Sequence, residues 1–395
     1  LVEDLISKNG SLHPVQEAMV NYHGSQCGFC TPGFVMSLFA MFKNYSKFKD
    51  NVIKDCIAGN LCRCTGYLPI MKAAKSLNSK NKIDHFTKNK HNTITLLKKI
   101  KDESIVIYKK DKKYFAPRYV QELKKILKKN INSHLLSGGT DLSLVVTKER
   151  KDINSIIYMN SIDELNYIKN NNKYIEVGAT TSLIAFESYI EKYYPDFTTI
   201  LKRYGSINIK NVATIAGNIA TASPIGDTLP LLLSLDAKVV LVSIKKTKIL
   251  PLNNFFLNYR RTKLKKGQFI HSIRIPLFPE NIFKAYKISK RFDDDISSVC
   301  ASFNLKVKNE KIKSIRVAYG GMASIPRRAI YCEKILLNSS MSEQIIDKAK
   351  KALEKDFKPI SDMRASGKYR MEVAKNLLQK CFLEITQKKL IRVNS

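Results

Sequence analysis

Four cysteines that form two close pairs constrain this chain more than any other feature of its sequence. Cys27 and Cys30 are spaced C-x-x-C, and Cys62 and Cys64 are spaced C-x-C. Thiolates from two such turns can close one tetrahedral sulfur shell, which holds zinc or iron–sulfur. Disulfides are not expected, because pairs this close bridge poorly and the chain is lysine-rich without a signal-peptide pattern. We therefore predict that these four thiols ligate a metal or a cluster.

The residues beside the pairs favour iron–sulfur over zinc without excluding zinc. Zinc sites usually combine two C-x-x-C knuckles, whereas the second pair here is C-x-C. Thr31-Pro32 predicts a helix start with the threonine as its cap, and further helices are expected from Gly66 to Lys75 and from Val52 to Ala58. Helix N-termini carry free N–H groups and partial positive charge, which suit anionic thiolates.

Length and composition bound the remaining possibilities. The chain has 395 residues, 44% of them apolar, enough for two or three domains with sizeable cores. No apolar run is long enough to span a membrane, and we expect a cytoplasmic protein without a membrane partner. Lysine and arginine (68) outnumber aspartate and glutamate (34), a net charge of +34. The lysines are spread along the whole chain rather than gathered in one basic motif. We interpret them as solvated surface and expect no nucleic-acid partner.

Shifts in composition predict the domain organisation. Residues 1–78 are expected to form a helical domain and residues 79–113 a linker with at most one short helix near Ile94 to Ile100. Residues 114–280 and 281–395 are expected to form two further domains that mix helices and strands. The expected strands are 134–136, 155–159, 174–179, 237–242, 283–288, 299–307 and 315–319; the expected helices are 119–129, 183–189 (capped by Ser182) and 229–235, with further helices after the last strand.

Two segments of the middle domain have the composition of a ligand site. Ser137-Gly138-Gly139-Thr140 follows a predicted strand, and glycine lets backbone N–H groups approach a pyrophosphate closely. Double glycines also simply make turns, and the segment lacks the G-x-G-x-x-G of a Rossmann fingerprint. Residues 213–227 carry so many small and hydroxyl side chains that we expect them to wrap a polar ligand rather than pack a core.

The cysteine motifs carry a specific family resemblance. Gln26-Cys27-Gly28-Phe29-Cys30-Thr31-Pro32-Gly33 and residues 59–67, with Leu12-His13-Pro14-Val15-Gln16 upstream, closely resemble the helical 2Fe–2S domain of the molybdenum hydroxylases, the xanthine dehydrogenase and aldehyde oxidase family. The resemblance implies that Cys27, Cys30, Cys62 and Cys64 ligate one 2Fe–2S cluster. It leaves Cys56 outside the ligand set.

The resemblance extends over nearly the whole chain. Residues 114–280 resemble the family's FAD-binding domain, of the vanillyl-alcohol oxidase or PCMH type, and residues 281–395 resemble the α+β C-terminal domain of CO dehydrogenase flavoproteins. The implied fold is multidomain: an all-α four-helix 2Fe–2S domain followed by two α+β domains. Asp141 replaces what is often glutamate in the family. The implied FAD contacts are Leu135, Leu136, Ser137, Gly138, Gly139, Thr140, Asp141 and Leu142 in a first pyrophosphate-cradling segment; Tyr204 beside the flavin; Thr214, Ile215, Ala216, Gly217 and Asn218 in a second FAD loop; and Asp227, Ile270 and Lys287.

The resemblance implies electron relay rather than substrate chemistry. It points to the small subunit of a xanthine dehydrogenase-type enzyme in a hetero-oligomer, with substrate oxidised at a molybdopterin-binding large subunit and NAD as acceptor. No catalytic acid or base is expected in this chain. The alternatives are a molybdenum hydroxylase for aldehydes or other N-heterocycles and, from another class, a basic metal-binding scaffold associated with nucleic acid. The family's ferredoxin-like domain with a second cluster is absent from the sequence, which opens at Leu1, so we expect an N-terminally incomplete polypeptide.

Overall fold

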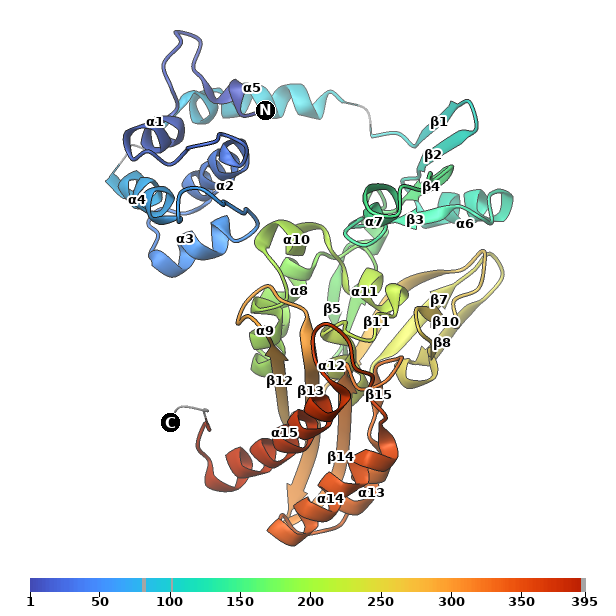
Figure 1. Ribbon diagram of the computed structural model, residues 1–395. Helices are drawn as coiled ribbons and strands as arrows, with labels where there is room; N and C mark the ends of the chain where they lie inside the picture. Colours follow the sequence, from blue (N-terminus) through green and yellow to red (C-terminus); the bar gives the residue numbers. More distant parts are fainter. Residues whose placement is uncertain (80–82, 101, 392–395) are drawn as a thin grey trace. The chain divides into compact units, whose positions relative to one another are not determined.

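A computed structural model describes residues 1–79, 83–100 and 102–391 (Figure 1). The chain divides into two compact units. One comprises Leu1–Asp102 with Ser206–Ile209, and the other comprises Glu103–Gly205 with Lys210–Ser395. Among the described residues, no helix combines the length and the apolar character needed to cross a membrane.

The first unit is built from helices around one hydrophobic core. Phe34, Leu38 and Phe42 place one face of the second helix in that core, where Val15 and Ile70 meet them. The helices of this core are α1 (Pro14–Asn21), α2 (Thr31–Asn44), α3 (Asp50–Ile57) and α4 (Leu68–Ser76). The all-α character predicted for this part of the chain is thus confirmed.

His13 fixes the start of α1 and ties it to a distant part of the unit. Its imidazole accepts a hydrogen bond from the Val15 N–H at 3.2 Å, and the Gln16 side chain accepts one from the His13 N–H at 3.0 Å. The other imidazole nitrogen lies 3.0 Å from Asp84 Oδ2, and Asp84 Oδ1 accepts a hydrogen bond from Lys43 at 2.8 Å. His13 and Asp84 are both buried, so this polar cluster pins the segment before α5 (His85–Lys98) to the helical core.

The region expected to be a linker contains more regular structure than its sequence suggests. Helix α5 has fourteen residues instead of the expected at most one short helix near Ile94 to Ile100, and Asp84 caps it by accepting from the Thr87 N–H at 2.7 Å. None of its residues is buried. A helix without a buried face has no apolar periodicity in its sequence, which is why the prediction was wrong here. Two strands, β1 (Ile105–Lys109) and β2 (Lys112–Ala116), also begin before residue 114.

The second unit opens with two sheets. The first has the order β1-β2-β4-β3, in which β2 and β3 (His134–Leu136) run parallel to β4 (Ser155–Tyr158). Helix α6 (Val120–Lys129) connects β2 to β3, and α7 (Ser143–Thr147) follows β3. The second sheet is antiparallel, with the order β5-β6-β11-β7-β8. Its strands are β5 (Ile168–Asn170), β6 (Tyr174–Gly178), β7 (Lys238–Val242), β8 (Thr247–Pro251) and β11 (Phe269–Pro276).

A run of short helices separates β6 from β7 and packs against the second sheet in a common core. Ser182 caps the first of them, accepting from the Ala185 N–H at 3.4 Å, as predicted. The small strands β9 (Phe256–Asn258) and β10 (Arg261–Thr262) form a separate hairpin. The helices are α8 (Leu183–Ile190), α9 (Pro195–Lys202), α10 (Ile207–Val212), α11 (Ile215–Thr221) and α12 (Thr228–Ser234).

The C-terminal part is a four-stranded sheet with helices on one face. The strand order is β12-β13-β14-β15, with β12 (Ile282–Ser289), β13 (Ser297–Lys308), β14 (Lys311–Gly320) and β15 (Arg327–Arg328). The helices α13 (Ile330–Leu336), α14 (Glu343–Asp356) and α15 (Gly367–Gln387) share a hydrophobic core with the sheet. Two α+β parts therefore follow the helical one, which confirms the predicted fold class.

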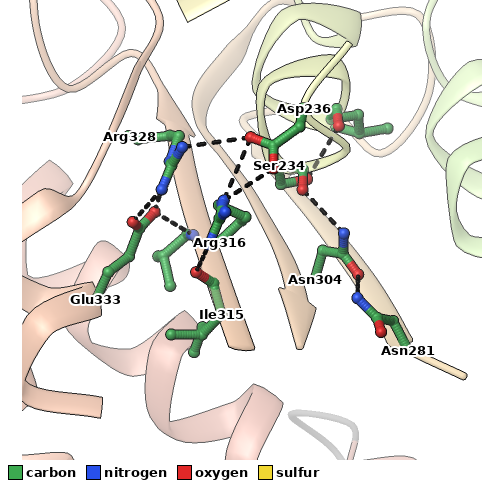
Figure 2. A network of polar contacts seen from close by, with 10 residues as sticks. Ser234, Asp236, Asn281, Asn304, Ile315, Arg316, Arg328 and Glu333 are labelled. Atoms are coloured by element: carbon green, nitrogen blue, oxygen red, sulfur yellow. Dashed lines mark hydrogen bonds and ion pairs between the residues drawn. The ribbon is translucent and has the colours of Figure 1, made fainter. Parts of the chain in front are cut away.

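A polar network joins the end of α12 to the C-terminal sheet, as Figure 2 shows. Asp236 accepts from Arg316 at 3.0 Å and from Arg328 at 3.3 Å, and Arg328 also pairs with Glu333. A cavity of about 340 Å³ lies beside this network and is lined by Asp236, Arg316, Lys306 and Glu280 among others. Its cations are paired with its anions, Arg316 with Asp236 and Lys306 with Glu280. None of the residues predicted to bind a cofactor lines it.

Candidate cofactor sites

The structure brings the four motif cysteines together in two pairs. The Cys64 thiol contributes to lowering the pKa of Cys27, and the Cys62 thiol contributes to raising that of Cys30, so the two thiols of each pair are neighbours. Among the described residues, no three His, Cys, Asp or Glu side chains are grouped so as to hold a single metal ion. A 2Fe–2S cluster takes four cysteine ligands, so two neighbouring thiol pairs would supply the donor set that this cluster needs.

The loops favour the thiolate form of two of the four cysteines, Cys62 and Cys27, whereas burial raises the pKa of Cys30 and the neighbouring Cys27 thiol raises that of Cys64. Cys62 Sγ lies 3.1 Å from the Thr65 hydroxyl and accepts from the Thr65 N–H at 3.4 Å. Together with the Cys64 N–H, these donors lower the pKa of Cys62 to about 7. The pKa of Cys27 is also lowered, mainly by the N–H of Phe29. Such donors stabilise the anionic ligands that an iron–sulfur cluster requires.

One detail of the prediction around this site was wrong. Cys30, not Thr31, occupies the cap position of α2, and no side chain caps the helix there. The Thr31 hydroxyl instead lies 2.6 Å from that of Ser25. This contact holds the loop that carries Cys27. The remaining cysteines, Cys56, Cys300, Cys332 and Cys381, are buried, and burial raises their pKa values.

The first segment predicted to cradle a pyrophosphate follows the edge strand β3 and is only partly buried. Ser137 donates to Asn160 at 2.6 Å, and Gly139 has a φ of +71°. In the part of the chain that the structure describes, the backbone N–H groups of residues 138–141 form no hydrogen bond. Consecutive unpaired N–H groups are the donors that bind phosphate oxygens, so the segment fits the pyrophosphate of FAD.

Gly138 brings this segment against the second one. A Cβ added at Gly138 would lie 2.1 Å from the carbonyl oxygen of Val212 and 2.8 Å from the Cα of Ala213. The missing side chain therefore makes room for the protein's own backbone, not directly for a ligand as we expected. Residues 135–142 and the chain entering Thr214 consequently lie side by side.

The second segment is a helix start and not a loop. Thr214 caps α11 by accepting from the Gly217 N–H at 3.0 Å, and Asn218 donates to the Tyr204 hydroxyl at 3.0 Å. Ile215, Ala216, Ile219 and Ala222 are buried in the core. The expectation that residues 213–227 pack little core was therefore wrong, because small side chains let the short helix lie close against its neighbours.

Tyr204 links the second segment to the acidic residues of the site. Burial raises the pKa of Tyr204, and the negative charges of Asp227 and Asp141 raise it further. Both carboxylates are therefore close enough to Tyr204 to interact with it electrostatically. Asp141 itself pairs with Arg260 at 2.5 Å. Ile270 lies on β11 with 5% exposure and packs in the core.

Asp227 and Lys287 form the most buried charge pair of this region. Lys287 Nζ lies 2.7 Å from Asp227 Oδ2, and the two side chains are 0% and 5% exposed. Lys287 also donates to the Arg203 carbonyl at 2.9 Å. Sequence reasoning did not identify three further contacts of the site: Arg260 on Asp141, and the hydroxyls of Thr228 on Asn218 and of Ser297 on Asp227. No sequence signal reveals Arg260 or Ser297, which lie far from their partners along the chain.

Comparison with known proteins assigns a family model to each of three parts of the chain. Residues 1–75 match a family model described as a 2Fe–2S binding domain, residues 108–278 match the FAD binding domain in molybdopterin dehydrogenase, and residues 284–385 match the CO dehydrogenase flavoprotein C-terminal domain. The chain belongs to the molybdenum hydroxylase family. The molybdenum hydroxylase chain thus carries a 2Fe–2S-binding and an FAD-binding domain, as predicted.

Individual relatives of this molybdenum hydroxylase chain are xanthine dehydrogenases. That of Emericella nidulans is 30% identical over 87% of this chain and 30% of its own length; that of Dictyostelium discoideum is 29% identical over 98% of this chain and 34% of its own length. The chain therefore spans about a third of these curated relatives.

Solved structures show the same fold in shorter chains. A chain of quinoline 2-oxidoreductase from Pseudomonas putida 86 superposes with a TM-score of 0.65 at 20% identity, over 70% of this chain and 98% of that one. A chain of carbon monoxide dehydrogenase from Hydrogenophaga pseudoflava superposes with a TM-score of 0.65 at 23% identity, over 69% and 96%.

Proposed function

We propose that this chain is the electron-transfer part of a molybdenum hydroxylase of the xanthine dehydrogenase type. It passes electrons from a molybdopterin-binding partner through a 2Fe–2S cluster to FAD and on to NAD. The observation that carries the proposal is the pairing of Cys27 with Cys64 and of Cys30 with Cys62 in one helical domain. When bound, an iron–sulfur cluster exchanges single electrons, and FAD converts two of them into a hydride equivalent.

The residues of the chain hold and orient these groups and perform no acid–base chemistry. Cys27, Cys30, Cys62 and Cys64 ligate the cluster, and the donors around Cys62 stabilise its thiolate. The unpaired N–H groups of residues 138–141 bind the FAD pyrophosphate. Tyr204, Asn218, Asp227 and Lys287 orient the rest of the cofactor, with Thr214 to Gly217 lying against the first segment through Gly138.

The surface around the thiols suits a docked partner. Phe29 and Leu61 lie within or beside the cysteine motifs and are 94% and 84% exposed. Large apolar side chains this exposed are typical of interaction sites. A partner that covers Phe29 and Leu61 would lie next to the cysteine motifs. We propose the molybdopterin-binding subunit as that partner, in a hetero-oligomer.

The proposed substrate is xanthine, because the relatives that match most of the chain are named for xanthine dehydrogenation. A second candidate is oxidation of another N-heterocycle, since one structural neighbour is a quinoline 2-oxidoreductase. Both reactions use the same relay in this chain, so the partner subunit distinguishes them.

The test is to co-purify the protein with its molybdopterin-binding partner. NAD reduction is then followed with xanthine, quinoline and an aldehyde. We expect xanthine to support NAD reduction, and alanine at Cys27 or Cys62 to abolish it while FAD stays bound. A Cys27 or Cys62 variant that turns over normally would refute the relay, and turnover with quinoline alone would replace the substrate.

A further inference from the structure

We infer that Ser297, the first residue of β13, is a positioning residue for FAD that acts by fixing the carboxylate of Asp227. This inference rests on the proposed function, because it deepens the role given there to Asp227. It assigns the C-terminal sheet a direct part in the flavin site.

Asp227 stands where a helix cap normally stands but does not act as one. It directly precedes α12, and its side chain makes no capping hydrogen bond to that helix. Aspartate at this position usually accepts from the first-turn N–H groups. Here the carboxylate turns instead toward the C-terminal sheet, where it is almost fully buried.

Two donors of that sheet hold the two oxygens of the carboxylate separately. Ser297 Oγ donates to Oδ1 at 2.5 Å, and Lys287 Nζ donates to Oδ2 at 2.7 Å. The lysine alone leaves the carboxylate free to rotate about its own axis, whereas a second donor on the other oxygen fixes its plane. A carboxylate accepts about four hydrogen bonds, so lone pairs remain for a donor group of the cofactor.

Ser297 is itself held rigidly. It is 1% exposed, and its neighbour Ser298 offers a carbonyl to the buried guanidinium of Arg370 on α15. Arg370 also donates to Asp362 at 2.7 Å. A second contact of the same strand, from the Cys300 thiol to the Asp227 carbonyl at 3.6 Å, keeps Asp227 against β13. These contacts hold the Ser297 side chain so that its hydroxyl is directed at Asp227 Oδ1.

The test is a double-mutant cycle on FAD affinity in the full chain, with FAD removed and titrated back by fluorescence quenching. Ser297→Ala should weaken FAD binding about tenfold, because a hydrogen bond to a charged group is lost. Ser297→Thr keeps the hydroxyl and should restore most of the affinity. In an Asp227→Asn background, which weakens binding by itself, Ser297→Ala should have little further effect.

Ser302→Ala is the matched control. Ser302 lies on the same strand, is fully buried and shares a hydrogen bond of 2.7 Å with Ser234, away from Asp227. Equal losses of affinity from Ser302→Ala and Ser297→Ala, or a Ser297 effect that persists in the Asp227→Asn background, would overturn the inference and leave the proposed function intact. Full FAD affinity in Asp227→Asn would instead overturn the placing of Asp227 in the flavin site, and the inference with it.

Discussion

Lys287 on β12 and Asp227 before α12 form an ion pair of 2.7 Å that joins the flavin domain to the C-terminal sheet. The exposed fraction of each side chain is 5% or less. A buried charge loses its hydration, so it is tolerated only while its counter-charge is present. This dependence makes the pair the most informative target for mutation.

Lys287→Met should lower the free energy of unfolding by about 3–5 kcal/mol and release FAD, because the Asp227 carboxylate is left buried and uncompensated. Denaturant unfolding and flavin content measure the two effects. Lys284→Met is the control on the same strand, since its carboxylate contacts are long, at 3.9 and 4.0 Å, and it should cost less than about 1 kcal/mol. Adding Asp227→Leu to Lys287→Met should recover stability but not FAD. Recovery of both would show that the pair serves packing alone.

Gly138→Ala should disturb the contact between the two FAD segments, because its Cβ would overlap the Val212 carbonyl. We expect a loss of about 1–3 kcal/mol in stability and weaker flavin retention, while the iron–sulfur absorption persists. Gly217→Ala, also in an FAD segment, should weaken flavin retention less, because its Cβ meets only the Thr214 hydroxyl at 3.1 Å and alanine favours a helix. Equal flavin retention in the two variants would contradict the assigned role of Gly138.

Serine at Cys27, Cys30, Cys62 or Cys64 should remove the visible cluster absorption, whereas Cys56→Ser should leave it unchanged. Iron and acid-labile sulfide are expected at about two each per chain in the unmutated protein. Cys56 is a stringent control because it lies in the same helical core and is buried. Stoichiometric zinc without a chromophore would be the decisive contrary result.

Acid should loosen the helical unit through His13 and Asp84. Burial lowers the pKa of His13 in the folded protein. As the pH falls through about 6.5, the unfolded chain binds a proton at His13 while the folded protein does not, so the free energy of unfolding decreases. Burial alone would raise the pKa of Asp84, but hydrogen bonds from Lys43, His13 and Thr87 outweigh it and lower the pKa. A second loss of stability therefore follows below about pH 4.

Hydrogen exchange of α1 to α4 in the full chain measures this pH dependence. Asp84→Asn should weaken protection at pH 7 and flatten the loss below pH 4. Asp50→Asn removes an exposed ion pair with Lys75 in the same unit and should change protection little. Identical pH profiles for the Asp84 variant and the unmutated chain would exclude this cluster as the acid-sensitive contact.

The sequence predicts those features whose cause is local. Cysteine spacing, Pro32 beside Cys30 and the Ser182 cap are all contained within a few residues, and the structure has the corresponding loop, helix and cap. Helix α5 was underestimated because no face of it is buried, so its sequence carries no periodic signal. The small residues of 213–227 were misjudged because close packing depends on the partner surface, which a sequence pattern does not contain.

In the candidate site too, contacts between residues far apart in the sequence could not be predicted. The family resemblance places Asp227 and Lys287 at the flavin, but their mutual contact joins residues 60 positions apart, and the contact of Ser297 with Asp227 spans 70. Hydroxyls such as Ser297 are common on strands and have no distinguishing neighbours. Only the three-dimensional arrangement separates Ser297 from Ser302.

Helix α5 and the Lys287–Asp227 pair bear differently on how a gene for this protein can be divided. A break within the second half of α5 severs no buried side chain of that helix, so the coding sequence can be split there into two polypeptides. A break between residues 227 and 287 would place the buried carboxylate of Asp227 and the ammonium of Lys287 on different polypeptides. Each polypeptide by itself would then contain a buried charge without its partner.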